Sequence, residues 1–247
     1  MKINGLTPVY FDIETTGFSA WEDSFVCATS GKQGKMAVFT DLEDLMNNIH
    51  PQDLDKHNDV LVTYNGENYR GGFDFPWLRS KCIQQGIEWQ LGGVKHLDLS
   101  PLVDKYINTH AYGEFKETDF KAPDLKKLAK ENGIDYQNKG QCLEKLKELE
   151  KPNWLDYKRK AKEDNSLQSV YQKLFDSEQE EEYISGEKIP ELYEKMKANK
   201  DYPGKAEDIW QQIKDHNRRD VERLKKVAEA VIPVIPDWEI ERNIKHL

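Results

Sequence analysis

Cysteine, long apolar runs and excess positive charge are what this chain of 247 residues has least of. Its three cysteines, Cys27, Cys82 and Cys142, lie far apart without a CxxC spacing, which argues against a disulfide framework and a zinc site. No apolar run approaches the roughly 18 residues that a membrane-spanning helix needs. The first residues also lack the charged, apolar and small-residue segments of a signal peptide. We therefore expect a soluble, cytoplasmic protein with no membrane partner.

The net charge of −9 argues against a protein that wraps nucleic acid tightly and non-specifically, because phosphate binding needs a basic surface. A site built from carboxylates nevertheless attracts phosphates once divalent ions load it, and a local basic patch can coexist with an acidic total. The densest basic cluster comprises Lys158, Arg159, Lys160 and Lys162. This cluster is either a solvated helix face or a track for a phosphate backbone.

The first half of the chain alternates segments typical of strands with segments typical of helices. Strands are expected where β-branched and aromatic residues gather, and helices where apolar residues recur every three or four positions. The expected strands are 9–15, 25–30, 36–40, 59–64 and 95–99, and the expected helices are 41–50, 75–85, 100–107 and 122–133. This alternation predicts an α/β sandwich.

The strand pattern ends at about Gly140, and the segments that follow are helical or loop-like as far as Pro203. We therefore expect one domain over residues 1–247, with a helical insertion at residues 140–203. The acidic run Ser177–Glu182 within the insertion is typical of a solvated helix face or loop.

Asp12 and Glu14 place two carboxylates on an otherwise apolar strand. Because side chains alternate along a strand, both project from the same face, only about 7 Å apart. Two like charges this close repel each other. A divalent cation is the simplest compensation, since Mg²⁺ and Mn²⁺ prefer carboxylate oxygens. The alternative is an edge strand whose acidic face meets water.

A helical stripe near the C-terminus combines two polar residues with apolar ones. His216 and Asp220 follow the stripe at steps of three or four residues, so both share its buried face. The other members are Ile209, Ile213, Leu224, Val227 and Val231. An unpaired buried carboxylate is costly, so Asp220 needs a salt-bridging arginine or a metal ion. A structural arrangement, in which Asp220 pairs with a core arginine and His216 with a backbone carbonyl, stays open.

A third feature is a strand followed by a glycine-rich turn and by Asp74 at the start of a helix. Taken alone, Asp74 is typical of a residue that caps its helix. The three features together, in the order Asp-x-Glu, Asn…Phe-Asp and His-x-x-x-Asp, are far more specific than any one of them.

The segments FDIETTG, YNG…FDFPWL and HNRRDVERL resemble the three exonuclease motifs of the DEDD superfamily. They are most similar to the proofreading domains of family B DNA polymerases and their stand-alone relatives, over residues 7–135 and 205–231. The resemblance implies a ribonuclease H-like fold, in which helices flank a mixed β-sheet, with the helical insertion before the last motif. It also implies hydrolytic removal of 3′-terminal nucleotides, with two Mg²⁺ or Mn²⁺ ions. The implied metal ligands are Asp12, Glu14, Asp74 and Asp220.

Two positions depart from the family pattern. An enlarged turn separates Asn65 from Asp74, whereas the family keeps these two residues a few positions apart. His216 stands four residues before Asp220, where the polymerase-like branch has tyrosine. The branch that uses histidine places it five residues before, at the position of Asp215.

Besides the metal ligands, the site is expected to include residues that handle water and substrate. His216 is the candidate to orient the attacking water or accept its proton. An imidazole suits this task because its unperturbed pKa, roughly 6.5, lies near neutral pH. Candidate substrate contacts are Thr15, Phe18, Asn65 and Phe73. The two phenylalanines either stack on terminal bases or belong to the core.

The expected function is therefore a metal-dependent 3′→5′ exonuclease that acts on nucleic acid, with single-stranded DNA as the favoured substrate. A 3′→5′ exoribonuclease is the alternative, because no residue identifiably reads a 2′-hydroxyl group. An alternative of another class is a non-catalytic nucleic-acid-binding module. The complete set of four carboxylates argues against that module.

Overall fold

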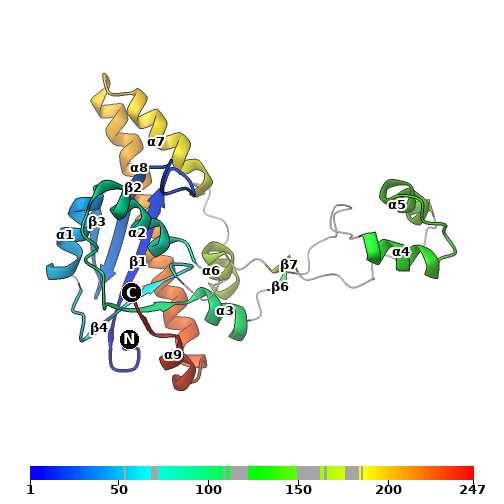
Figure 1. The fold of residues 1–247 in the computed structure, drawn as a ribbon, viewed down its shortest axis with the longest axis horizontal. Coiled ribbons are helices and arrows are strands. Elements are labelled where there is room, and N and C mark those ends of the chain that lie inside the picture. Colours follow the sequence, from blue (N-terminus) through cyan, green and yellow to red (C-terminus); the bar gives the residue numbers. More distant parts are fainter. Residues whose placement is uncertain are drawn as a thin grey trace. The chain divides into compact units, whose positions relative to one another are not determined.

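The computed structural model describes residues 1–52, 54–67, 72–107, 110–111, 122–148, 162–163, 166–175, 184 and 186–247. The chain divides into two compact units (Figure 1). The larger unit comprises Met1–Thr109 and Asn165–Leu247, and the smaller one comprises His110–Asp164.

The larger unit is built on a six-stranded mixed sheet with the order β3-β2-β1-β4-β5-β8. The strand β1 pairs antiparallel with β2 and parallel with β4, so it lies inside the sheet. The strands are β1 (Thr7–Thr15), β2 (Phe25–Lys32), β3 (Lys35–Phe39), β4 (Asp59–Thr63), β5 (Lys95–Asp98) and β8 (Lys245–His246). The predicted mixed sheet is thus confirmed. Because Glu14 is buried, the alternative of an acidic strand face that meets water is wrong.

Helices flank this sheet, as the sequence predicts. The helices described in the larger unit are α1 (Leu42–Gln52), α2 (Asp74–Gln85), α3 (Ser100–Tyr106), α6 (Leu167–Phe175), α7 (Ile189–Ala198), α8 (Pro203–Val231) and α9 (Asp237–Asn243), with the 3-10 helices η3 (Gly186–Lys188) and η4 (Ile232–Val234). None of the described helices is both long and apolar enough to cross a membrane.

The side chains of β1 alternate between two hydrophobic cores. Val9, Phe11 and Ile13 pack into a core that α1 and α2 complete. Tyr10 packs into a second core, to which α3, α6 and α8 contribute. Asp12 shares the face of Tyr10 because side chains alternate along a strand. The long helix α8 therefore covers the face that carries the acidic pair (Figure 1).

The smaller unit contains two helices with a core of their own. It is formed by β6 (His110–Ala111), α4 (Ala122–Glu131), α5 (Lys139–Glu148) and β7 (Lys162–Glu163). The buried residues between the helices are Leu125, Leu128, Ala129, Cys142 and Leu146. Gly133 follows α4 with a φ of +69°, a left-handed conformation that suits glycine. The side chain of Asn138 accepts a hydrogen bond from the amide of Gln141 and so caps α5.

These bounds differ from the helical region at 140–203 that the sequence suggests. The smaller unit begins before that region, at His110, and ends within it, at Asp164. The helices α6 and α7, which follow, pack against α8 in the larger unit. A shift from strands to helices along the sequence marks composition, whereas the limits of a compact unit depend on tertiary contacts. The acidic run Ser177–Glu182 lies outside the described residues.

Candidate active site

The strand β1 and the helix α8 bring the first and third motifs together. In the pairing of β1 with β2, Asp12 lies opposite Thr29 and Glu14 lies opposite Cys27. Because these positions are two residues apart, both carboxylates point to the face that α8 covers, as the sequence predicts. We call the contact between β1 and α8 the seam. Buried apolar residues hold it together, since Ile13 of β1 is buried on the opposite face and Val221 of α8 is buried on this one.

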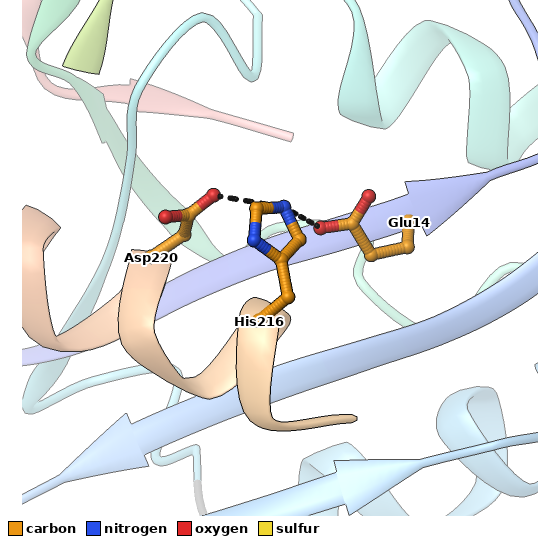
Figure 2. Close-up of side chains that lie close together, drawn as sticks. All are labelled: Glu14, His216 and Asp220. Atoms are coloured by element: carbon orange, nitrogen blue, oxygen red, sulfur yellow. Dashed lines mark ion pairs between the residues drawn. The ribbon is translucent and has the colours of Figure 1, made fainter. Parts of the chain in front are cut away.

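His216 lies between two carboxylates at this seam. Its Nε2 atom is 3.3 Å from Oε1 of Glu14 and 3.5 Å from Oδ2 of Asp220, one turn further along α8. Figure 2 shows the imidazole on α8 between these two side chains. The side chain of His216 is buried, whereas that of Asp220 is partly open to solvent. The predicted convergence of His216 and Asp220 on the acidic pair is what the structure shows.

Asn217, which follows His216, holds the acidic pair from the same helix. Its side-chain amide donates a hydrogen bond of 2.7 Å to Oδ2 of Asp12 and a longer one, 3.5 Å, to Oε1 of Glu14. Asn217 is fully buried. One neutral amide thus bridges the two carboxylates of β1.

Arg223 gives Asp220 a cationic neighbour. Its Nη1 atom donates to Oδ1 of Asp220 across 3.1 Å, and its guanidinium lies over the ring of Tyr171 in α6 at 5.7 Å. The expected arginine partner of Asp220 is therefore present. The other carboxylate oxygen of Asp220 faces His216, so the arginine pair and the candidate metal site coexist.

Asp74 enters the site from the first turn of α2. The residue that precedes the helix is Phe73, and among the described residues no side chain caps it, so the interpretation of Asp74 as a helix cap is wrong. The carboxylate of Asp74 is buried, and its Oδ2 atom has no hydrogen-bond partner among the described residues. A buried, unpaired carboxylate oxygen is costly unless a cation or a proton compensates it.

Asn65 and Phe73, on either side of the enlarged turn before α2, are joined by a hydrogen bond. Asn65 adopts a left-handed conformation with a φ of 72°, and its carbonyl accepts a hydrogen bond of 2.7 Å from the amide of Phe73. The amide of Asn65 donates across 2.9 Å to the carboxylate of Asp98, at the end of β5. Asn65 therefore stays beside Asp74 despite the longer spacing between them in the sequence.

The three motifs meet at a single cavity of about 460 Å³. The predicted site residues around it are Asp12, Glu14, Asp74, His216, Asp220, Phe18, Asn65 and Phe73. Thr15 is not among the lining residues, and its hydroxyl donates a hydrogen bond of 2.7 Å to the carbonyl of Gly17 instead. Phe18 is 91% exposed and meets Phe73 edge to face at 5.7 Å. The core interpretation is therefore wrong for Phe18.

The predicted basic cluster is not part of the described site. Lys158, Arg159 and Lys160 lie outside the described residues. Lys162 belongs to β7 in the smaller unit. The role expected of this cluster stays a prediction.

Burial and mutual repulsion dominate the electrostatics of the site. Burial raises the pKa of Asp12 well above its ordinary value, and the charge of Asp220 raises it further. The pKa of Glu14 is raised in the same way by burial and then by Asp12. Burial also raises the pKa of Asp74, with smaller effects of Asp12 and Asp98. The pKa of His216 is lowered by burial, which outweighs the opposing effect of Asp220.

This donor set fits a divalent cation. One ligand atom each from Glu14, His216 and Asp220 lie within 4.8 Å of one another. The unpaired oxygen of Asp74 adds a further donor at the same cavity. The carboxylates suit Mg²⁺ and Mn²⁺, whereas an imidazole ligand favours a transition-metal ion. The positive charge of any of these ions would relieve the repulsion described above.

The sequence analysis does not identify three residues of the site, namely Asn217, Arg223 and Asp98. Asn217 stands three residues before Asp220 and Arg223 stands three after it. Residues at this spacing share a face of a helix, so the pattern contains a usable signal. Asp98, by contrast, reaches Asn65 only through the pairing of β4 with β5, which short-range patterns do not encode.

Comparisons with known proteins agree with this geometry. The sequence matches the model of the RNase_H superfamily in two overlapping stretches, residues 9–142 and 102–232. A DNA polymerase of Thermococcus sp. (strain 9oN-7) is 31% identical over 114 residues, and the match covers 37% of this chain. It covers only 14% of the polymerase, so the chain spans a small part of that protein's length. Together these matches confirm the resemblance and the ribonuclease H-like fold, and they support a hydrolytic nuclease. The chain belongs to the RNase H superfamily.

Proposed function

We propose that this protein is a divalent-metal-dependent 3′→5′ exonuclease that removes nucleotides from single-stranded DNA. One observation carries the proposal: the carboxylates of all three motifs meet at one cavity together with His216. The resemblance of these motifs to those of DEDD exonucleases supplies the direction of cleavage. The partial match to a DNA polymerase favours DNA as the substrate.

Asp12, Glu14, Asp74 and Asp220 are the residues that would hold the metal ions. Two bound ions would supply Lewis-acid polarisation of a phosphodiester and neutralise its negative charge. The protein's own part is to hold the oxygens of these side chains in place. Asn217 does this for Asp12 and Glu14, and Arg223 does it for Asp220.

His216 is the residue suited to handle a proton. Burial lowers the pKa of its imidazole, so the ring is neutral near neutral pH and can orient a water molecule or accept its proton. Its Nε2 atom lies at the cavity, between the carboxylates of Glu14 and Asp220. The departure from tyrosine at this position gives the site an imidazole, whose ordinary pKa is about 6.5, where the polymerase-like branch has a phenol, whose ordinary pKa is about 10.

The walls of the cavity suit the end of a single strand. Phe18 is almost fully exposed next to Phe73, and an exposed ring of this kind can stack on a terminal base. Asn65 offers an exposed amide at the same cavity. Stacking accepts any base, so this arrangement favours an enzyme without sequence preference.

The direct test is a nuclease assay with single-stranded DNA labelled at its 5′ end, in Mg²⁺, in Mn²⁺ and in excess chelator. We expect a ladder of products shortened from the 3′ end, and only when a divalent ion is present. Internal cuts, or shortening from the 5′ end, would contradict the proposed direction. Cleavage in chelator would contradict the metal requirement.

Matched RNA and duplex substrates complete the assay. Faster degradation of RNA than of DNA with the same sequence would replace the proposal by an exoribonuclease. Binding of both nucleic acids without cleavage in either metal would support the non-catalytic module. The Asp12→Asn protein serves as the control for contaminating nucleases.

A further inference from the structure

A second hollow lies along the seam between β1 and α8, beside the turn that joins β2 to β3. It has a volume of about 300 Å³, within the range of small-molecule sites, which begins at about 300 Å³. None of its lining residues also lines the catalytic cavity among the residues described. The two cavities are therefore different places on the same pair of elements.

Glycine at position 31 keeps this hollow open. Gly31 lies opposite Tyr10 in the pairing of β1 with β2. A Cβ atom on Gly31 would lie 3.0 Å from a methyl group of Val221, so close that the Val221 side chain would have to give by a few tenths of an ångström. Without a side chain here, strand backbone and the ring of Tyr10 form the floor, and α8 forms a wall.

Tyr10 places a hydrogen-bond donor in that floor. The residue is only 4% exposed, and its hydroxyl has no hydrogen-bond partner among the residues that the structure describes. Burial, together with the charge of Glu229, raises the pKa of the phenol, so the group stays protonated and able to donate. A buried hydroxyl without a partner is unfavourable, and a ligand with an acceptor oxygen or nitrogen would satisfy it.

The other lining residues restrict the class of ligand. Met36 and Val221 provide apolar surface for a flat, apolar group. Lys35 and Lys225 provide cations for an anionic group. Glu222 and Glu229 lie in the same lining and can accept hydrogen bonds from amino groups. The lining therefore complements a ligand that combines an apolar body, an acceptor, an amino donor and a negative charge.

We propose that this hollow binds a nucleoside monophosphate. The apolar ring of such a ligand would lie against Met36 and Val221, and its phosphate near Lys35 and Lys225. A hydroxyl, ring nitrogen or carbonyl of the ligand accepts from Tyr10. The choice of a monophosphate rests on the proposed function, because exonucleolytic hydrolysis releases this product. The presence of the hollow and its lining residues do not depend on the proposed function.

Met36 offers a direct reporter of binding. The chain has four methionines, so a spectrum of protein labelled with ¹³C in the methionine methyl groups is simple. Met36 lines the hollow and is 39% exposed, whereas Met46 is fully buried in the other core and serves as an internal reference. Deoxyadenosine monophosphate is titrated in excess chelator, where the catalytic carboxylates repel the phosphate. We expect a saturable shift of the Met36 signal, which Met36→Leu identifies, and no shift of the Met46 signal.

Two variants and two partial ligands decide the outcome. Tyr10→Phe removes only the hydroxyl oxygen, and we expect it to weaken binding about fivefold, the effect of one hydrogen bond. Lys225→Gln should weaken binding as well, whereas the exposed control Lys200→Gln should not. Deoxyadenosine without phosphate, and inorganic phosphate alone, should each bind more weakly than the monophosphate. Equal binding of phosphate alone, unchanged binding by Tyr10→Phe, or no shift of Met36 would each overturn the proposal.

The same experiments separate this proposal from the proposed function. Titration in chelator requires no cleavage, so a Met36 shift in a protein without nuclease activity would leave the binding site standing and refute the exonuclease. An active nuclease whose Met36 signal does not respond would refute only the second site.

Discussion

Asp12, Glu14 and Asp74 hold their carboxyl groups where ionisation is unfavourable, because Glu14 and Asp74 are buried, Asp12 is half-buried and each lies near another acid. Asn217 donates to two of them, but it carries no positive charge. Without a metal ion, folding therefore brings negative charges together at a cost in stability. A bound divalent ion would remove much of that cost, so metal binding and folding stability should be coupled.

The pH dependence of stability tests this coupling in the metal-free protein. Because burial and repulsion raise the pKa of these carboxyl groups in the folded state, folding favours their protonated forms. Their stabilising effect is complete below the unfolded pKa and disappears as the pH rises through the folded pKa. We expect Asp12→Asn to melt at a higher temperature than wild type at neutral pH in chelator, with a smaller difference at acidic pH. An equal difference at every pH, or the same gain from the exposed control Asp208→Asn, would contradict this explanation.

The same Asp12→Asn variant tests the catalytic role of the acidic pair. An amide cannot replace the charge of a carboxylate that binds a divalent ion, so we expect nuclease activity to fall at least about a hundredfold. The rise in melting temperature on adding Mn²⁺ should shrink as well. Circular dichroism checks that the variant is folded. A folded Asp12→Asn protein with near-normal activity would exclude Asp12 as a ligand.

Asn217→Leu tests whether the buried amide positions the two carboxylates. Leucine is similar in size but donates no hydrogen bond, so Asp12 and Glu14 lose their shared donor. Partners behind the metal ligands typically change metal affinity or activity by about 10–100-fold, and we expect a loss in this range. Mn²⁺ titration of thermal unfolding measures the affinity. Gln212→Leu, an exposed position on the same helix, is the control, and equal Mn²⁺ affinity in the two variants would refute the role of Asn217.

The sequence predicts the charged residues of this site better than the groups that hold them. Asp12, Glu14 and Asp220 stand out because a carboxylate on an apolar stripe needs an explanation. Asn217 gives only a weaker signal, its spacing of three residues from Asp220 on the same helix. That its amide donates to both carboxylates of β1 depends on the packing of α8 against β1, which the sequence pattern does not reveal.

At the scale of the elements, the strand and helix segments of the first half are largely predictable, but their arrangement is not. Local periodicity identifies β1 to β5, because each strand carries its own alternation or apolar run. The two-residue strand β8 is too short for any pattern, and it joins the sheet only through its pairing with β5. The order of the strands depends on contacts between distant residues, which one sequence does not reveal.

The helix α2 also supports the loop that carries Phe18. The ammonium group of Lys81 is buried and donates to the carbonyls of Ala20, at 3.0 Å, and of Asp23, at 2.6 Å. It also donates to Gln84 within α2. One lysine thus ties the loop after β1 to the helix that begins with Asp74.

Lys81→Met tests this support. Methionine keeps the apolar stem but leaves the loop carbonyls without their donor, so we expect a loss of about 1–3 kcal/mol in the free energy of unfolding. Because the loop presents Phe18 and none of the metal ligands, KM for single-stranded DNA should rise more than kcat falls. Urea unfolding and steady-state kinetics measure the two effects, with the exposed Lys200→Met as the control. A fall confined to kcat would place the effect at the carboxylates instead.

At the scale of the whole molecule, charge is distributed unevenly between the two units. In His110–Asp164 the 13 lysines and arginines exceed the 12 aspartates and glutamates by one, so the larger unit carries a net charge of −10 out of the total of −9. An acidic catalytic unit repels the long phosphate backbone of its proposed substrate, except where metal ions are bound. Productive binding of long strands therefore needs positive charge from elsewhere, and the smaller unit contains the densest basic cluster.

Neutralising this cluster is the corresponding prediction. Replacing Lys158, Arg159, Lys160 and Lys162 by alanine should weaken binding of long single strands and flatten the dependence of log affinity on log salt. Each phosphate group bound on a single strand adds about −0.7 to that slope, so the change in slope measures how many phosphate groups the cluster binds. Cleavage of very short oligonucleotides should change little, because they do not reach beyond the catalytic cavity. A matched variant with the same change in charge replaces Lys126, Lys127, Lys130 and Lys145 of α4 and α5. Equal slopes in wild type and both variants would exclude the smaller unit as a track for nucleic acid, whereas an equal weakening in both variants would indicate attraction by its total charge rather than by one cluster.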